Sequence, residues 1–238
     1  MIGLLGILPG LLKYLMCGRY TFYAGKDLSD RFSLDPDYDR GLDLSKNFNV
    51  SPGQFMPVVT SGEKGNHLSL MRWGLVPSWA KDSKIGFRMI NARADTVSVK
   101  PSFRNSFRRQ RCLIPANGFY EWQTDGKKKT PYYFTLKKEP LFAFAGLWEE
   151  WTDQNNMKLQ TYTIITTNAN KLIKPIHDRM PVILKPQNEA TWLNEKTDPD
   201  SLLSLLKPYS PPAMLSTKVS DRLNRSSEND PRLIKPIS

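Results

Sequence analysis

The sequence RCLIPANGFYEW, at residues 111–122, sits near the middle of the chain and sets its architecture. Its first half, Arg111 to Ala116, is a mostly apolar run of the length that a buried strand needs. Asn117-Gly118 then interrupts the run with two residues that favour turns. We therefore predict a buried strand that is broken at Asn117-Gly118, with strand-rich structure on both sides of the break.

Patterns typical of strands, turns and short helices extend outward from this stretch in both directions. Further strands are predicted at 18–23, 55–60, 67–75, 132–136, 141–147 and 159–167, with polar turns at 61–65, 124–129, 137–140 and 152–156. Short helices are predicted at 27–32, 101–110, 189–194 and 198–206, and a helix or turn at 168–173. The Pro-, Ser- and Asn-rich tail after Lys207 is expected to wrap the surface. There is no repeat and no long linker, so we expect one β-rich domain.

The composition narrows the classes of function. Of 238 residues, 39% are hydrophobic and 11% aromatic, which suits a folded globule. The formal net charge of +11 favours a polyanionic partner such as nucleic acid, although charge that only maintains solubility would give the same balance. The two cysteines cannot form a disulfide framework, and no CxxC or Cys/His cluster indicates zinc. We therefore expect no metal, no organic cofactor and a reducing cytoplasm.

The N-terminal segment Met1 to Leu15 differs from the rest of the chain. It is apolar, but Pro9 and Gly10 interrupt it, and it is shorter than the roughly 20 residues that a membrane span needs. It lacks both the basic start and the small-x-small cleavage site of a secretory signal. We predict that residues 1–15 are an upstream-start extension or, as the second choice, a short propeptide. Residues 16–238 then form the domain, and removal of Met16 leaves Cys17 as the N-terminal residue.

Four polar motifs stand out: CGR at 17–19, NARAD at 91–95, PANGFYEW at 115–122 and HDRMP at 177–181. Each has a structural explanation when it is taken alone. Glu121 could pair with an arginine, Asn91 could satisfy the backbone at a strand end, and His177 could be a surface histidine in a polar turn. Cys112 lies beside apolar residues and is expected to be a small core residue.

Taken together, the motifs resemble those of the SOS response-associated peptidase (SRAP) family, whose members crosslink to abasic DNA. The resemblance runs from Met16 to about Ile234. It rests on MCGRY at 16–20, NVSPG at 49–53, RWGLVPSW at 72–79, INARADT at 90–96, RCLIPANGFYEW at 111–122, HDRMP at 177–181, and V, S and N at 219, 220 and 224. It implies an α+β, β-rich fold with a distorted, barrel-like antiparallel sheet core, short flanking helices and a basic DNA-binding cleft.

The resemblance also implies the chemistry. The α-amine of Cys17 would attack the aldehyde of an abasic site, and its thiol would then close a thiazolidine ring. Both groups react near neutral pH, because an α-amine has a pKa of about 7.7–8.0 and a thiol one of about 8.5. Glu121 is the expected proton shuttle, His177 the expected acid for opening the sugar ring, and Asn91 the group that orients the aldehyde or the amine.

The same resemblance implies a DNA-binding surface. Trp79 and Phe103 are expected to stack on bases or to act as wedges where duplex meets single strand, and the alternative is that both are core aromatics. The other residues expected at the DNA are Arg19, Asn49, Pro52, Arg93, Arg104 and Thr166, with Lys100 and Arg108 as further phosphate contacts. Ala80 stands where some members carry a second tryptophan, which implies a weaker block to duplex on the 3′ side. An arginine of another member near Pro101 has no clear counterpart here.

Together these features predict an abasic-site sensor that binds single-stranded DNA and crosslinks to it through Cys17 during the DNA-damage response. Self-processing ahead of Cys17 and an abasic-site lyase side reaction are expected as secondary activities. One alternative is a thiol peptidase with Cys17 as nucleophile, His177 as base and Asn91 as orienting group. The other is a non-covalent binder of single-stranded DNA. We expect a monomer in the cytoplasm, associated with the nucleoid and without a membrane partner.

Overall fold

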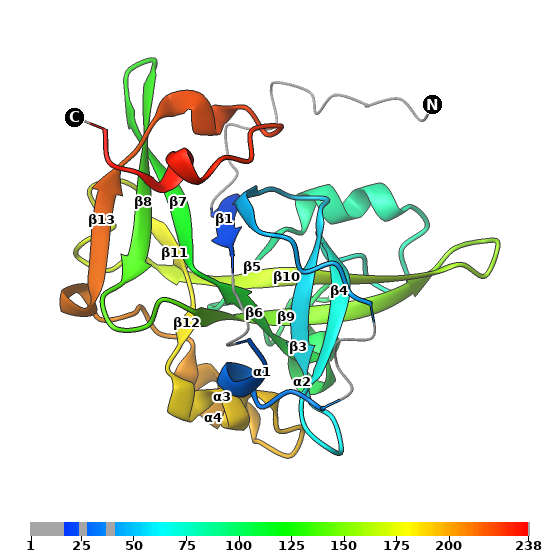
Figure 1. Cartoon of the computed structure of the whole chain (residues 1–238). Helices are drawn as coiled ribbons and strands as arrows, with labels where there is room; N and C mark the ends of the chain where they lie inside the picture. Colours follow the sequence, from blue (N-terminus) through cyan, green and yellow to red (C-terminus); the bar gives the residue numbers. More distant parts are fainter. Residues whose placement is uncertain (1–16, 24–27, 37–40, 238) are drawn as a thin grey trace.

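The computed structural model describes residues 17–23, 28–36 and 41–237. The predicted extension 1–15 and Met16 lie outside this range. Within it, two β-sheets wrap around one core, with short helices at the periphery (Figure 1). This arrangement confirms the predicted α+β, β-rich, barrel-like fold.

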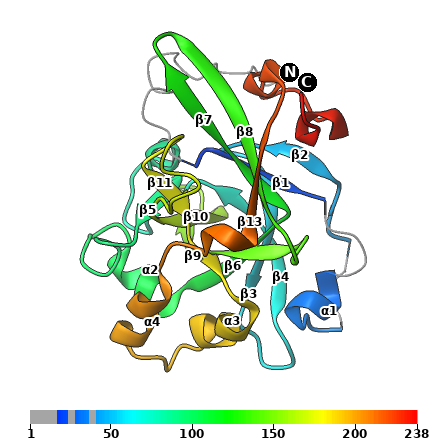
Figure 2. The ribbon, with the colours of Figure 1, turned by 90° about the vertical axis from the view of Figure 1, so that its left-hand side faces the viewer.

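The smaller sheet has five strands, in the order β13-β8-β7-β1-β2. These strands are β1 (Arg19–Phe22), β2 (Asn47–Val50), β7 (Gly118–Asp125), β8 (Lys128–Leu136) and β13 (Met214–Lys218). The predicted turn at 124–129 is mostly strand, because β7 and β8 pair as far as Asp125 and Lys128. This hairpin projects from the body of the molecule (Figures 1 and 2).

The larger sheet has eight strands, in the order β11-β10-β4-β3-β6-β9-β12, with β5 paired to β10. Its strands are β3 (Phe55–Thr60), β4 (His67–Trp73), β5 (Asn91–Arg93), β6 (Arg111–Ala116), β9 (Phe142–Thr152), β10 (Lys158–Asn168), β11 (Arg179–Pro181) and β12 (Ile183–Leu184). Most pairs are antiparallel, but β10 runs parallel to both β4 and β5. The parallel pairs place the end of β5 beside the end of β10.

The predicted break at Asn117-Gly118 is confirmed, and it is where the chain passes from one sheet to the other. The Asn117 side chain accepts from the backbone N–H of Tyr23 at 2.7 Å and donates to the carbonyl of Pro140 at 2.6 Å. Gly118 lies against Tyr133, so that a β-carbon there would come within 2.4 Å of the ring. The turn thus requires both a short amide and a residue without a side chain.

Four α-helices lie among the described residues: α1 (Leu28–Phe32), α2 (Arg104–Arg109), α3 (Pro186–Leu193) and α4 (Pro199–Leu205). The buried Arg111 joins two of them, because its guanidinium donates to the carbonyls of Phe107 at 2.8 Å and Trp192 at 2.7 Å. Short 3₁₀ turns complete the set: η2 (Ser83–Arg88), η3 (Pro211–Ala213), η4 (Asp221–Asn224) and η5 (Pro231–Ile234). Across the described ranges, no helix is long and apolar enough to cross a bilayer.

The core has two parts. The main cluster fills the space between the sheets and includes Tyr20, Trp73, Phe119 and Phe144. A smaller cluster of Tyr120, Tyr133, Val219, Leu223 and Leu233 joins the C-terminal segment to β7 and β8. The tail therefore wraps the surface as expected, but it also contributes β13, which the sequence did not predict.

Candidate functional site

Cys17 and Glu121 meet where β1 begins. β1 pairs antiparallel with β7, with Arg19 opposite Tyr120, and this register brings Cys17 to Glu121. The backbone N–H of Cys17 donates to Oε1 of Glu121 at 2.9 Å. Cys17 has a φ of 46°, a left-handed conformation that is uncommon for a residue with a β-carbon. The structure thus joins the two residues through the nitrogen of Cys17.

The carboxyl group of Glu121 is almost fully buried, at 1% exposure. Burial raises its pKa to about 8, an effect that hydrogen bonds from Cys17 reduce but do not cancel. The sequence placed this residue in an aromatic strand, which is the setting that produces such a shift. At neutral pH Glu121 therefore carries a proton in most molecules and can both give and take one.

The thiol of Cys17 is also buried, at 3% exposure. Its pKa is raised well above the ordinary value, first by burial and then by the neighbouring Glu121, while the positive charge of Arg179 opposes the shift. The thiol is therefore protonated at neutral pH, and Arg179 is the cation that favours its ionised form. Arg179 belongs to the HDRMP motif, yet sequence reasoning gave it no role.

Arg179 is held firmly at the end of β10. Its guanidinium donates to the carbonyl of Thr166 at 2.6 Å and to Oδ1 of Asn168 at 3.0 Å. The arginine is 5% exposed, and its Nε has no hydrogen-bond partner within the part of the chain that is described. A buried guanidinium with a spare donor is suited to binding an anion.

His177 lies next to this arginine. Its Nδ1 accepts from the backbone N–H of Arg179 at 3.1 Å, so that the proton of the neutral ring belongs on Nε2. Burial lowers the pKa of His177, which keeps the ring neutral at pH 7. No hydrogen bond joins His177 to Cys17 among the described residues. Asn91 is the first residue of β5, where it pairs with Ile164 of β10, and Thr166 follows two positions along β10.

A cavity of about 730 Å³ opens beside Arg179. It is lined by Arg93, Asn168, Ala169, Asn170, Lys171, Lys174, Asp178 and Arg179. Four of these residues are cationic. The one acidic residue of the lining, Asp178, forms an ion pair with Lys174. Arg93 is exposed and forms an ion pair with Asp95 at 2.9 Å. This cationic cavity, next to the HDRMP motif, is a candidate for the predicted basic cleft.

The two aromatic residues expected to stack differ in exposure. Trp79 is 60% exposed, and the neighbouring Ala80 carbonyl accepts from the indole of Trp151 at 2.7 Å. Phe103 is 3% exposed, with Nζ of Lys100 5.6 Å from its ring centroid, which favours the core alternative. Arg104 lies on the exposed side of α2.

Phe87 is an exposed aromatic that sequence reasoning missed, at 43% exposure. It lies over the turn that contains Pro52, because a β-carbon on Gly53 would be 3.3 Å from its ring. Gly53 also has a φ of +89°, which excludes most other residues. The sequence signal was an aromatic residue within a polar loop.

Two residues expected at the DNA are engaged inside the protein. Nη1 of Arg19 donates to Oδ1 of Asn49 at 2.6 Å and to the Leu223 carbonyl at 3.0 Å. Asn49 is 1% exposed. Their side chains face the C-terminal segment.

Comparison with known proteins gives consistent results. A family model described as SOS response associated peptidase (SRAP) matches residues 16–226. Abasic site processing protein YoqW of Bacillus subtilis (strain 168) is 48% identical over 223 residues, which are 92% of this chain and 99% of that protein. Abasic site processing protein HMCES of Xenopus tropicalis is 32% identical over 233 residues, covering 88% of this chain and 68% of that protein. The crystal structure of a protein from Bacteroides thetaiotaomicron superposes with a TM-score of 0.85 at 32% identity, covering 93% of this chain and 100% of that one.

Proposed function

Because the chain belongs to the SOS response associated peptidase (SRAP) family, we propose that it processes abasic sites by forming a covalent crosslink to single-stranded DNA through Cys17. The observation that carries the proposal is the 2.9 Å contact between the nitrogen of Cys17 and Oε1 of buried Glu121. Once Met16 is removed, this nitrogen becomes a primary amine that stays beside a proton acceptor. The relatives are named abasic site processing proteins, which supports abasic DNA as the substrate in this proposal.

The reaction proceeds in two bond-forming steps. The unprotonated amine of Cys17 adds to the sugar aldehyde, and loss of one water gives an iminium. The sulfur then adds to the same carbon, the thiol proton is released, and the ring nitrogen keeps the electron pair of the C=N bond. The net change joins protein and DNA and releases one water, with no oxidant or reductant. The iminium also allows β-elimination of the 3′ phosphate, which would account for a lyase side reaction.

Glu121 is the proton carrier for these steps. It accepts the ammonium proton that must leave before attack, and it returns a proton to the departing hydroxyl group. Burial raises the pKa of Glu121 to about 8 beside the neutral N–H of the peptide-bonded chain, and the ammonium of a free Cys17 terminus would lower it from there, which favours the carboxylate that accepts this proton. Removal of a general acid–base of this kind typically slows a reaction by about 10²–10⁴-fold.

His177 and Asn91 act on the sugar. The neutral imidazole of His177 offers Nε2–H as the donor for ring opening, since Nδ1 is occupied by the backbone of Arg179. Asn91 would orient the aldehyde from the start of β5.

The strand would run past the basic cavity. Arg93, Lys171 and Arg179 line it and are placed to neutralise phosphates. Trp79 would stack on a base, with Phe87 as a second exposed ring near Pro52. Arg104 is a further contact in this proposal, whereas a role for Phe103 or Thr166 would require a buried side chain to become exposed. We place this activity in the cytoplasm, during the response to DNA damage, with the protein acting as a monomer.

A crosslinking assay with defined N-termini tests the proposal. Protein that begins at Cys17 is incubated with a single-stranded oligonucleotide holding one abasic site and resolved under denaturing conditions. We expect an adduct with wild type and with the control Cys112→Ala, and none with Cys17→Ala or with protein that retains Met16. A thiazolidine requires the free α-amine of Cys17, which Met16 blocks, whereas a thiol peptidase requires no α-amine. Adduct formation by the Met16-retaining protein would therefore contradict the proposal.

A further inference from the structure

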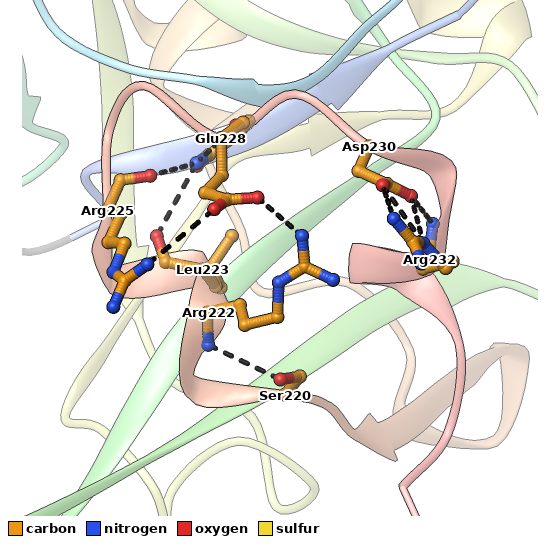
Figure 3. A network of polar contacts seen from close by, with 8 residues as sticks. Ser220, Arg222, Leu223, Arg225, Glu228, Asp230 and Arg232 are labelled. Carbon is orange, nitrogen blue, oxygen red and sulfur yellow. Dashed lines mark hydrogen bonds and ion pairs between the residues drawn. The ribbon is translucent and has the colours of Figure 1, made fainter.

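Residues 219–234, which we call the strap, form a separate layer over β1, β2 and β7. The strap contains η4 and η5 and is held in shape by its own ion pairs. Figure 3 shows Arg222 bound to Glu228 at 2.7 Å and Asp230 bound to Arg232. The strap and β1 lie near opposite ends of the chain, so the contacts described below are tertiary.

Asn49 joins the strap to β2 with both ends of its amide. Nδ2 donates to the carbonyl of Glu228 at 2.9 Å and to that of Arg225 at 3.0 Å, with the Leu223 carbonyl at 3.4 Å. Oδ1 accepts from Arg19 at 2.6 Å, and the same Arg19 nitrogen also donates to the Leu223 carbonyl. An amide is the one short side chain that can donate and accept in this way.

The strap also contacts both neighbours of Glu121. Asn224 accepts from the indole N–H of Trp122 at 2.8 Å. Leu223 and Leu233 pack in the small apolar cluster that includes Tyr120. The strap therefore contacts Tyr120 and Trp122, which flank Glu121. It also contacts Arg19, which lies two positions after Cys17.

We propose that Asn49, Arg19 and the strap are positioning elements that hold the amine of Cys17 against Glu121. A chain terminus frays unless it is tied down, and removal of Met16 would leave Cys17 only two residues ahead of Arg19. β1 has four residues and pairs with both β2 and β7, but Cys17 lies outside the strand, two residues before its first residue. The Arg19–Asn49–strap contacts anchor its first residue. This inference rests on the proposed crosslinking function.

The decisive variant is Asn49→Asp. It keeps the acceptor for Arg19 but replaces the donor with an oxygen that faces the carbonyls of the strap. Trp122→Phe is the second variant, since it removes the indole N–H that reaches Asn224 but keeps an aromatic ring against the small apolar cluster. Lys158→Ala is the matched control, because it breaks an exposed ion pair with Glu150 at 2.8 Å that lies outside the strap and leaves the contacts to Asn49 intact.

Three quantities are measured for each variant in protein that begins at Cys17. They are the crosslinking rate at saturating abasic DNA, the affinity for a non-reactive abasic analogue, and the melting temperature. For Asn49→Asp we expect the rate to fall about tenfold or more, because misplacing reacting groups by a fraction of an ångström is costly, while affinity changes less than about twofold. The rate should also fall for Trp122→Phe, with its pH profile displaced, and it should stay at the wild-type value for Lys158→Ala.

Each other outcome rejects the inference. An unchanged rate, measured well below the melting temperature, would mean that the strap only stabilises the fold. A loss of affinity with an unchanged rate in the bound complex would make Asn49 a DNA contact, as the family resemblance implied. If the wild-type protein itself failed to crosslink, the proposed function would be wrong, and this result would be distinguished from the others because it does not depend on the variants.

Discussion

At the scale of single residues, the site depends on how Glu121 is buried. Among the described residues, its carboxyl group is hydrogen-bonded to Cys17, through both the backbone nitrogen and the thiol, and the strands around it enclose the rest. A carboxylate in such a place is costly unless it is protonated or paired with a cation. In the chain with the Met16–Cys17 peptide bond intact, the partner is a neutral N–H, so the carboxyl group holds its proton. A free amine at the same position would supply a cation.

This setting makes stability depend on pH. Unfolding returns the pKa of Glu121 from about 8 to its ordinary value of 4.5, so the unfolded state binds fewer protons between these values. The contribution of Glu121 to the free energy of unfolding is therefore fully present below pH 4.5, and it is lost as the pH rises toward 8. In protein that retains Met16, Glu121→Gln should gain stability relative to wild type as the pH increases from 5 to 9.

Thermal unfolding of the two proteins at both pH values measures this difference. A gap in melting temperature that stays the same at pH 5 and pH 9 would show that Glu121 ionises normally in the folded protein.

At the scale of elements, the passage from β6 to β7 is tightly constrained by packing. Gly118→Ala would place a β-carbon 2.4 Å from the ring of Tyr133, whose hydroxyl group is fixed to Thr21 at 2.8 Å. Overpacking of this kind typically costs about 1–3 kcal/mol. We expect the free energy of unfolding to fall by that amount in urea titrations.

Gly126→Ala serves as the control for this variant. Gly126 lies in the turn of the same hairpin and has open space around it, but its φ is +56°, so only backbone strain is added. Equal losses for the two variants would contradict the steric explanation.

The strands that the sequence predicted are those with their own apolar pattern. β3, β4, β6 and β10 lie close to the predicted ranges, because each is an apolar run bounded by turn residues. β5 and β11 have three residues each and β12 has two, so they carry no periodicity to detect. β13 lies in a Pro- and Ser-rich tail and becomes a strand only by pairing with β8.

The residues of the candidate site also divide into those that the sequence could predict and those that it could not. Motifs identified Cys17, Asn91, Glu121 and His177 as candidates, and the structure joins Cys17 to Glu121. The burial of Arg179 and the contacts between Asn49 and the strap could not be predicted, since they join residues that are far apart in sequence. Those roles depend on tertiary structure alone.

At the scale of the whole molecule, the chain has a net charge of +11, and the lining of the cavity beside Arg179 includes four cationic residues and one acid. For single-stranded DNA, each neutralised phosphate contributes about −0.7 to the slope of log K against log salt concentration. Arg93→Ala should therefore reduce the steepness of that slope by about 0.7. Fluorescence anisotropy with an abasic-analogue oligonucleotide across a salt series measures it.

Lys127→Ala provides the control, because Lys127 lies in the exposed turn of the β7–β8 hairpin, away from the cavity lining. A salt slope that changes equally for both variants would mean that the DNA responds to total charge and not to this cavity.

The central claim is that both the amine and the thiol of Cys17 are consumed by the abasic sugar. The most direct measurement is the intact mass of the adduct after denaturation and alkylation of free thiols. The chain has two cysteines, and Cys112 serves as the internal standard. The account predicts the mass of protein plus DNA minus one water, with one alkyl group added. An adduct carrying two alkyl groups would show that the thiol of Cys17 remains free, and would contradict the thiazolidine.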